Sequence, residues 1–200
     1  MPPVAVPAEK LHEFADFQAF YAWLAAHHDS EAEIWVRLFK KGSGHPGITP
    51  LEAIDAVLCW GWIDAIKKSW DAHSFVQRYC PRQPRSVWSR INRDNIARLD
   101  AAGLLAAPGR RHVEAAKADG RWDAAYATTM APPADLMAAI AASPAAQAAY
   151  AQLSAQNRFA LTFRTVSLRT AAARARKIAA FVAMLERGET VYPQADRGNG

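Results

Sequence analysis

Cysteine is scarce in this 200-residue chain: there are only two, Cys59 and Cys80, and they do not form a C-x-x-C pair. Two cysteines are too few for a disulfide framework, and in a reducing compartment both are expected to remain thiols. The six histidines are scattered apart from His27 and His28, and adjacent helical residues point in different directions. The sequence therefore predicts neither a structural metal nor a cofactor.

Long apolar runs are also missing. No stretch approaches the roughly 18 apolar residues that a membrane-spanning helix needs, because Pro, Ser, Gln and Arg interrupt the alanine-rich segments. The N-terminal MPPVAVPAEK is too short in apolar residues to be a secretory signal, so we expect a cytoplasmic protein. The net charge of +5 and the pI near 9.4 favour acidic or phosphate-bearing partners.

The common signatures of catalysis are absent. The chain has no G-x-x-x-x-G-K-[ST], G-x-G-x-x-G, G-x-S-x-G or H-E-x-x-H sequence. Cys59 has no histidine near it in sequence, and a catalytic thiolate needs a base or a cationic environment. Asp64 could act as a general base, but no second carboxylate accompanies it. The sequence therefore favours a protein that is not an enzyme, and we assign no catalytic residue.

The chain changes character along its length. Hydrophobic periodicity and capping residues predict three helices and three strands in the first part of the chain. They are helix 17–27 after Asp16, strand 34–39, helix 50–60 after Thr49, strands 63–69 and 75–79, and a helix capped by Ser89 or Asn92 that ends near Gly103. Only helices are expected beyond it: 108–119, 133–142, 144–153, 154–166 and 170–187.

These elements predict an α+β fold, with a small N-terminal β-sheet or hairpin unit with helices followed by an all-helical C-terminal half. The expected organisation is a flexible N-terminus (1–15), an α+β domain (16–127), a helical region (133–192) and a disordered tail (193–200). The segment TTMAPPA, residues 128–134, is the expected linker.

Polar and aromatic residues concentrate on the hairpin and on the loop that follows it. Strict alternation along the first hairpin strand places Asp64 on the same face as Trp62 and Lys67 on the opposite face. The candidate ligand-binding residues are Trp62, Asp64, Lys67, Gln77, Arg78, Arg82, Arg85, Ser86, Trp88, Ser89 and Asn92.

Two explanations of this cluster stay open. Arginine forks bind carboxylates or phosphates and tryptophan offers a stacking surface, so the cluster could hold a small anionic or planar ligand. Alternatively Asp64 pairs with Arg78 or Arg82 and joins the hairpin to the loop, while the tryptophans anchor the core.

Several segments of the chain carry a family resemblance: WVRLFKKGSG, TPLEAIDAVLCWGWID, QRYCPRQPRSVWSRIN, AKADGRW and ARARKIAAFVAMLERGETVYP. Together, from about residue 20 to 192, they resemble the YdeI/OmpD-associated family, also called the bacteriocin-protection or OmdA-like family. Its polar signature falls on GWID, QR-x-x-PR and S-x-WS-x-x-N of this chain. Ala65 stands where the family often has glycine, and residues 168–171 replace the usual polar approach to the last helix.

The resemblance implies a role in resistance to antimicrobial peptides and, in some members, an association with an outer-membrane porin. It implies no particular reaction. A chain without an export signal does not reach the outer membrane by the usual route, so such a contact would be indirect.

Three hypotheses follow. The first is a non-enzymatic binding or stress-protection protein that holds a small anionic ligand or a protein partner at the cluster. The second is an enzyme of unrecognised type that uses Asp64 with the arginines. The third is a nucleic-acid-binding protein that uses basic residues to contact phosphates. A solvent-exposed charged surface is the simpler explanation of these residues. They are Lys40, Lys41, Arg164, Arg169, Arg174, Arg176, Lys177 and Arg187. The sequence does not define an oligomeric state.

Overall fold

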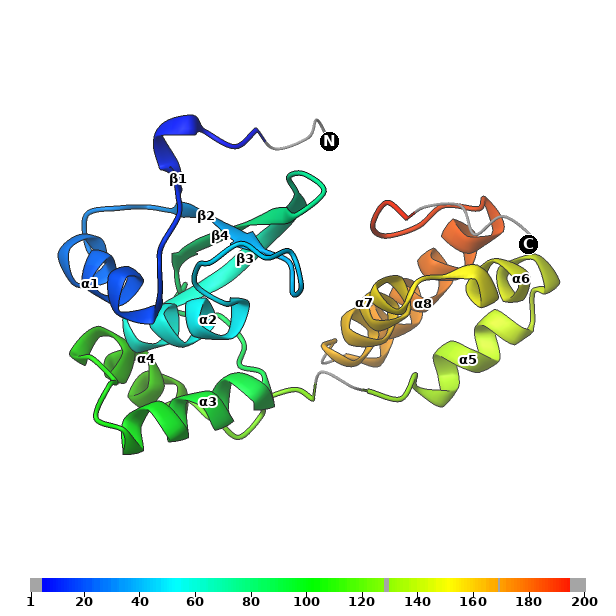
Figure 1. The fold of residues 1–200 in the computed structure, drawn as a ribbon. Coiled ribbons are helices and arrows are strands. Elements are labelled where there is room, and N and C mark those ends of the chain that lie inside the picture. Colours follow the sequence, from blue (N-terminus) through cyan, green and yellow to red (C-terminus); the bar gives the residue numbers. More distant parts are fainter. Residues whose placement is uncertain (1–4, 128–129, 169, 195–200) are drawn as a thin grey trace. The chain divides into compact units, whose positions relative to one another are not determined.

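A computed structural model of the chain describes residues 5–127, 130–168 and 170–194. The chain divides into two compact units, residues 1–127 and 128–200 (Figure 1). The described residues combine one four-stranded sheet with helices, so the predicted α+β class is confirmed.

The sheet of the first unit has the strand order β1-β2-β4-β3. The strands β2 (Ile34–Phe39), β3 (Trp62–Ser69) and β4 (Ser74–Pro81) are antiparallel neighbours and confirm the three predicted strands. The short strand β1 (Leu11–His12) follows the 3-10 helix η1 (Ala8–Lys10) and pairs in parallel with β2. It lies in the segment for which the sequence predicted no element, because two residues are too few to show alternation.

A β-bulge in β3 corrects the predicted arrangement of side chains. Asp64 pairs with Tyr79, but Lys67 pairs with Gln77, so three steps along β3 correspond to two along β4. Gln77 and Tyr79 are two residues apart and share a face of the sheet. Lys67 therefore lies on the face of Asp64, where strict alternation placed it on the other.

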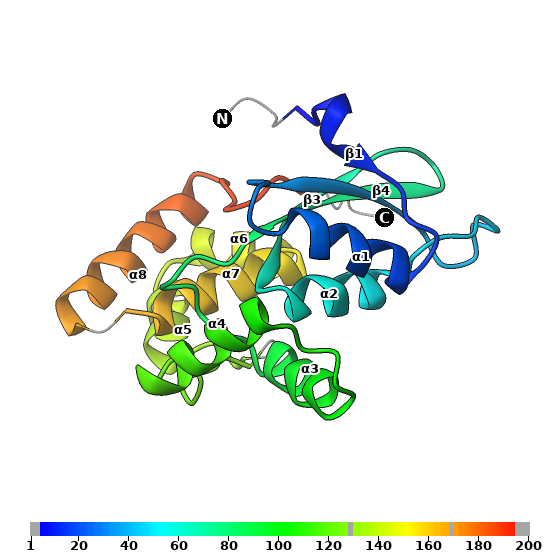
Figure 2. The ribbon, with the colours of Figure 1, turned by 90° about the vertical axis from the view of Figure 1, so that its left-hand side faces the viewer.

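Two helices cover one face of this sheet. Figure 2 shows α1 (Phe17–His27) and α2 (Pro50–Cys59) side by side beneath the strands. Asp16 caps α1 as predicted, and a capping box begins α2, with Thr49 Oγ1 accepting from the Glu52 backbone N–H at 3.3 Å. The apolar residues between helices and sheet form the first core, which includes Phe20, Leu24, Val36, Val57, Trp62 and Tyr79.

A second core lies on the other side of α2. There α3 (Arg90–Ala101) and α4 (Ala107–Ala118) pack against the end of α2, around Leu58, Cys59 and Trp88. The cap of α3 is Ser89, whose Oγ accepts from the Asn92 backbone N–H at 3.1 Å. The backbones of α2 and α4 come so close that a Cβ on Gly109 would lie 2.3 Å from the Cys59 carbonyl oxygen.

The second unit contains α5 (Ala134–Ala141), α6 (Pro144–Gln152), α7 (Ala155–Val166) and α8 (Ala171–Glu186). These agree with the predicted helices to within about two residues at each end. Thr170 caps α8, because its Oγ1 accepts a hydrogen bond from the Ala173 backbone N–H. The helix therefore has an N-terminal cap although the sequence before it differs from the one usual in the family. Their apolar faces meet in a third core: Leu136, Ile140, Ala146, Leu153, Leu161, Ile178, Phe181 and Leu185.

The predicted linker and tail are described only in part. Residues 128, 129 and 195–200 lie outside the described residues, and 130–133 form neither helix nor strand. Gln194, predicted to belong to a disordered tail, accepts hydrogen bonds from the Ser154 backbone N–H and from Asn157 Nδ2. None of the described helices has the length and apolar character needed to cross a membrane.

Candidate functional site

The centre of the candidate site is Arg82, the first residue after β4. Its backbone N–H donates to the Gly61 carbonyl oxygen at 3.0 Å, which ties the end of the hairpin to the turn after α2. Its side chain is only 3% exposed, and the guanidinium carbon lies 3.8 Å from the ring centroid of Trp88. Nη1 donates to the Val87 carbonyl oxygen at 2.9 Å. The loop after β4 thus folds back over the Arg82 side chain.

Three donors of this stacked pair have no acceptor. Nε and Nη2 of Arg82 and Nε1 of Trp88 are buried and have no hydrogen-bond partner among the described residues. Buried polar atoms in proteins are almost always paired, and an unpaired one costs about 1–3 kcal/mol or more when it is charged. An arginine and a tryptophan supply only donors, so what would satisfy them is a group rich in acceptors.

Charges around Arg82 act in both directions. Burial and, after it, the charge of Arg121 lower the pKa of Arg82 to about 10, against the opposing effects of Tyr126 and Asp64. Arg121 is held in place by its ion pair with Asp119 and by donation from Nη1 to the Ser86 carbonyl oxygen at 2.9 Å. The guanidinium group of Arg82 is therefore held largely out of water, beside a second arginine.

Asp64 belongs to this group through its charge. Its side chain reaches the surface, yet enough protein atoms surround the carboxyl group for burial to raise its pKa, against the opposing effect of Arg82. Its negative charge in turn contributes to the raised pKa of Tyr79 and Tyr126, after burial. Asp64 thus lies within electrostatic range of Arg82.

The sequence missed three members of the site: Arg121, His112 and Tyr126. Burial and the charges of Arg82, Arg111 and Arg121 lower the pKa of His112. A signal for Arg121 was present, since it lies in the segment AKADGRW that carried part of the resemblance. Nothing in the sequence pointed to His112 or Tyr126, because both reach the site through the packing of distant segments.

Two of the predicted residues have partners elsewhere. Trp62 is buried in the first core, and its Nε1 donates to the His28 carbonyl oxygen at 3.1 Å. Arg78 forms an ion pair with Glu33. The explanation in which Asp64 joins the hairpin to the loop offered two partners, Arg78 and Arg82. Arg78 is paired with Glu33, and the positive charge of Arg82 is the one that acts on the pKa of Asp64.

The remaining predicted residues divide between support and surface. Lys67 lies over the Phe75 ring at 3.9 Å, and Gln77 is buried beside it in the sheet. Ser86 contributes its carbonyl oxygen to Arg121, and Ser89 with Asn92 forms the cap of α3. Arg85 is exposed. Whether these residues bind a ligand stays a prediction.

Cysteine chemistry finds little support in the state of Cys59. Burial, with a contribution from Asp55, raises the pKa of the Cys59 thiol to about 12, so the reactive thiolate is disfavoured. In the part of the chain that the structure describes, no three His, Cys, Asp or Glu side chains come together where they could hold a metal ion.

The geometry defines an α+β domain with a buried cationic site, followed by a helical unit. Residues 12–112 match the family model described as Domain of unknown function (DUF8412), and because this match spans half of the chain, the chain belongs to that family. Residues 129–188 match the model described as Bacteriocin-protection, YdeI or OmpD-Associated, which confirms the predicted resemblance for the second unit. No curated protein and no solved structure matches the chain.

The matches correct the extent of the resemblance. It was placed over about residues 20–192, whereas the YdeI/OmpD-associated match covers only 129–188. The site built around Arg82 and Trp88 falls within the other match. The family description that mentions bacteriocin protection thus concerns a match to residues 129–188 alone.

Proposed function

We propose that the first unit binds a small anionic ligand, a carboxylate or a phosphate, through Arg82 and Trp88. The observation that carries this proposal is the set of three buried donors, Nε and Nη2 of Arg82 and Nε1 of Trp88, that have no acceptor among the described residues. An anionic group supplies several acceptor oxygens at once and neutralises the guanidinium.

The surroundings of Arg82 support this choice of ligand. Stacking on Trp88 and donation to the Val87 carbonyl oxygen fix the guanidinium plane, so little side-chain entropy is left to lose on binding. Arg121 adds a second positive charge, and its own ion pair with Asp119 keeps it in position. A neutral ligand would bring no charge to oppose the buried guanidinium group of Arg82.

In this proposal the chain is a non-enzymatic cytoplasmic protein of stress protection, in which the helical unit gives the link to bacteriocin resistance. The match of residues 129–188 supports that link. Ligand binding in the first unit would then stabilise the protein or signal to a partner.

The test is isothermal titration of the full chain with citrate, inorganic phosphate and AMP, comparing wild type with Arg82→Met and Arg85→Met. Removing a charge-assisted contact costs about 1.5–3 kcal/mol, which weakens binding about tenfold to a hundredfold. We expect one anion to bind to wild type and to Arg85→Met, whose side chain is exposed, and to be lost in Arg82→Met. Equal binding by both variants, or none by wild type, would reject the proposal.

A second candidate is an enzyme that uses Asp64 as a general acid or base. Burial raises the pKa of this carboxyl group, which is the shift that such a role requires. Incubation of each bound anion with the protein, followed by NMR of the small molecule, decides between the two. Turnover that disappears in Asp64→Asn while binding persists would support catalysis, and an unchanged ligand would leave the binding function.

A further inference from the structure

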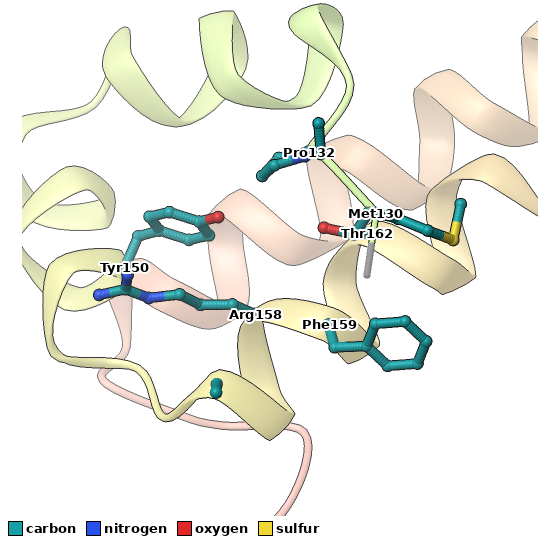
Figure 3. A pocket seen from close by; sticks show the side chains of 8 residues that line it. Met130, Pro132, Tyr150, Arg158, Phe159 and Thr162 are labelled. Atoms are coloured by element: carbon teal, nitrogen blue, oxygen red, sulfur yellow. The ribbon is translucent and has the colours of Figure 1, made fainter. Parts of the chain in front are cut away.

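The helical unit contains a cavity that the site around Arg82 does not involve. Its volume is about 580 Å³, within the range of about 300–1,000 Å³ found for small-molecule sites. Figure 3 shows the side chains that line it, which come from the segment before α5, the end of α6 and the first half of α7. Every lining residue belongs to the second unit.

The walls of the cavity are largely apolar and aromatic. Phe159 and Tyr150 supply ring faces and edges, and Met130 and Pro132 lie across from Arg158 (Figure 3). Such surfaces favour a flat ring, because aromatic and proline side chains present extended contact area at little cost in side-chain entropy. Methionine adapts its shape to the ligand.

The hydroxyl group of a buried residue faces this cavity. Thr162 is 1% exposed and is one of the residues that line the cavity. In Figure 3 its oxygen points toward the phenol oxygen of Tyr150 across the open space. Two hydroxyl groups therefore converge on one region of the cavity, and each can both donate and accept.

Arg158 places a positive charge at the edge of the same space. Its Nη2 donates to the Ala151 carbonyl oxygen at 2.7 Å, and its guanidinium carbon lies 5.5 Å from the Tyr150 ring centroid. These two contacts fix the side chain but leave Nε and Nη1 free to donate. No carboxylate of the described residues forms an ion pair with Arg158. One uncompensated cation beside an aromatic cavity matches one negative charge on an aromatic ligand.

We infer that this cavity is a binding site for a small aromatic monocarboxylate. Its ring lies between Phe159, Tyr150 and Pro132, and its carboxylate accepts from Arg158. The Thr162 and Tyr150 hydroxyl groups donate hydrogen bonds to the same carboxylate. The site is separate from the one proposed at Arg82, so either can fail without the other.

The probe is 2-naphthoate, titrated into the full chain by calorimetry, with 2-naphthylmethanol as its neutral analogue. We expect one-to-one binding of the carboxylate and about tenfold weaker binding of the alcohol, which lacks the charge-assisted contact. Arg158→Gln should weaken naphthoate binding about tenfold or more, because it removes the charge that faces the carboxylate. Thr162→Val should weaken it about twofold to tenfold, because it removes one of two hydroxyl donors at constant shape.

Two matched variants make the assignment specific. Arg164→Gln changes an arginine of the same helix that stacks on Tyr192, outside the cavity, and should leave the dissociation constant unchanged. Arg82→Met should also leave it unchanged, which separates this site from the anion site of the first unit. Circular dichroism and melting temperature verify that each variant is folded.

The inference is overturned if naphthoate shows no saturable binding to the wild type. It is equally overturned if Arg158→Gln binds naphthoate as well as the wild type does, or if the alcohol binds as tightly as the carboxylate. Loss of binding in Arg82→Met alone would assign the naphthoate to the first unit and reject the cavity as its site.

Discussion

The two units use an arginine above an aromatic ring in opposite ways. In the first unit Arg82 is buried against Trp88 at 3.8 Å, and two of its nitrogens have no acceptor among the described residues. In the second unit Arg158 lies 5.5 Å from Tyr150 and is exposed, so water can satisfy its free donors. Burial of the arginine therefore decides what a bound ligand contributes. In the first unit the ligand would relieve the free-energy cost of buried donors without acceptors, and in the second unit the ligand must displace water from the arginine.

The distribution of tryptophan makes the two units separately observable. All seven tryptophans lie between residues 23 and 122, in the first unit, and none lies in the second. Tryptophan fluorescence thus reports on unfolding of the first unit, while far-ultraviolet circular dichroism reports on helices of both. We expect denaturant unfolding to show two transitions by circular dichroism and one by fluorescence.

The largest expected effect is in the helical core. Leu161→Ala removes a fully buried side chain from the third core and should lower the free energy of unfolding by about 2–5 kcal/mol. The circular dichroism transition of the second unit should move to lower urea, while the fluorescence midpoint stays in place. A fluorescence midpoint that moves equally would show that the two units unfold as one.

The next effect tests the close approach of α2 and α4 in the first unit. Helix propensity alone predicts that Gly109→Ala stabilises by about 1 kcal/mol. The added Cβ, 2.3 Å from the Cys59 carbonyl oxygen, should instead destabilise by about 3 kcal/mol, seen as a lower fluorescence midpoint. The control is Gly120→Ala, with φ of +78° and no atom within 4 Å, which should cost about 1 kcal/mol.

A smaller effect concerns the attachment of the C-terminal segment to α7. Asn157 is fully buried, donates to the Tyr192 carbonyl oxygen at 3.0 Å and accepts from the Tyr192 backbone N–H at 2.9 Å. Asn157→Ala should cost about 2 kcal/mol, because it leaves these backbone groups without partners. Thermal unfolding by circular dichroism measures it, with the exposed Gln156→Ala as a control that stays within about 0.5 kcal/mol.

The smallest effect is a pH dependence at His112. Burial and nearby arginines lower its pKa in the folded state, so the unfolded state takes up its proton at a higher pH. The wild type should therefore lose stability as the pH falls through about 6.5, the ordinary histidine value. His112→Gln should reduce this loss, and the change in melting temperature between pH 7 and pH 5 should differ by less than about 4 °C. An identical pH dependence in both proteins would contradict the assignment.

The prediction from sequence succeeded where local rules decide the structure. Asp16 and Thr49 each accept a hydrogen bond from the first turn of a helix, and the helices begin where these residues indicated. It failed at β1, which exists only because β2 offers a backbone to pair with, and at Lys67, whose face a single bulged residue reversed.

The candidate site likewise contains residues that the sequence indicated and residues that only the folded structure brought to it. Asp64, Arg82 and Trp88 could be selected from the sequence because they stand close together on a hairpin and its following loop. His112 and Tyr126 could not, since α4 and the segment after it reach Arg82 only after α2 and α4 have packed against each other. Arg121 lies in the segment AKADGRW, but nothing in the sequence placed it beside Arg82. The cavity beside Arg158 left no signal either, because its walls come from three separate segments of the helical unit.

The sequence by itself determined the α+β class, the order and nearly all limits of the helices and strands, and the arginine and tryptophan at the centre of the candidate site. These depend on interactions between residues only a few positions apart, whose geometry the backbone fixes. Only the tertiary structure decided that two nitrogens of Arg82 are buried without acceptors among the described residues, that Arg78 pairs with Glu33, and that Thr162 faces a cavity. Burial and charge pairing depend on atoms far apart in the chain, and those are brought together by packing alone.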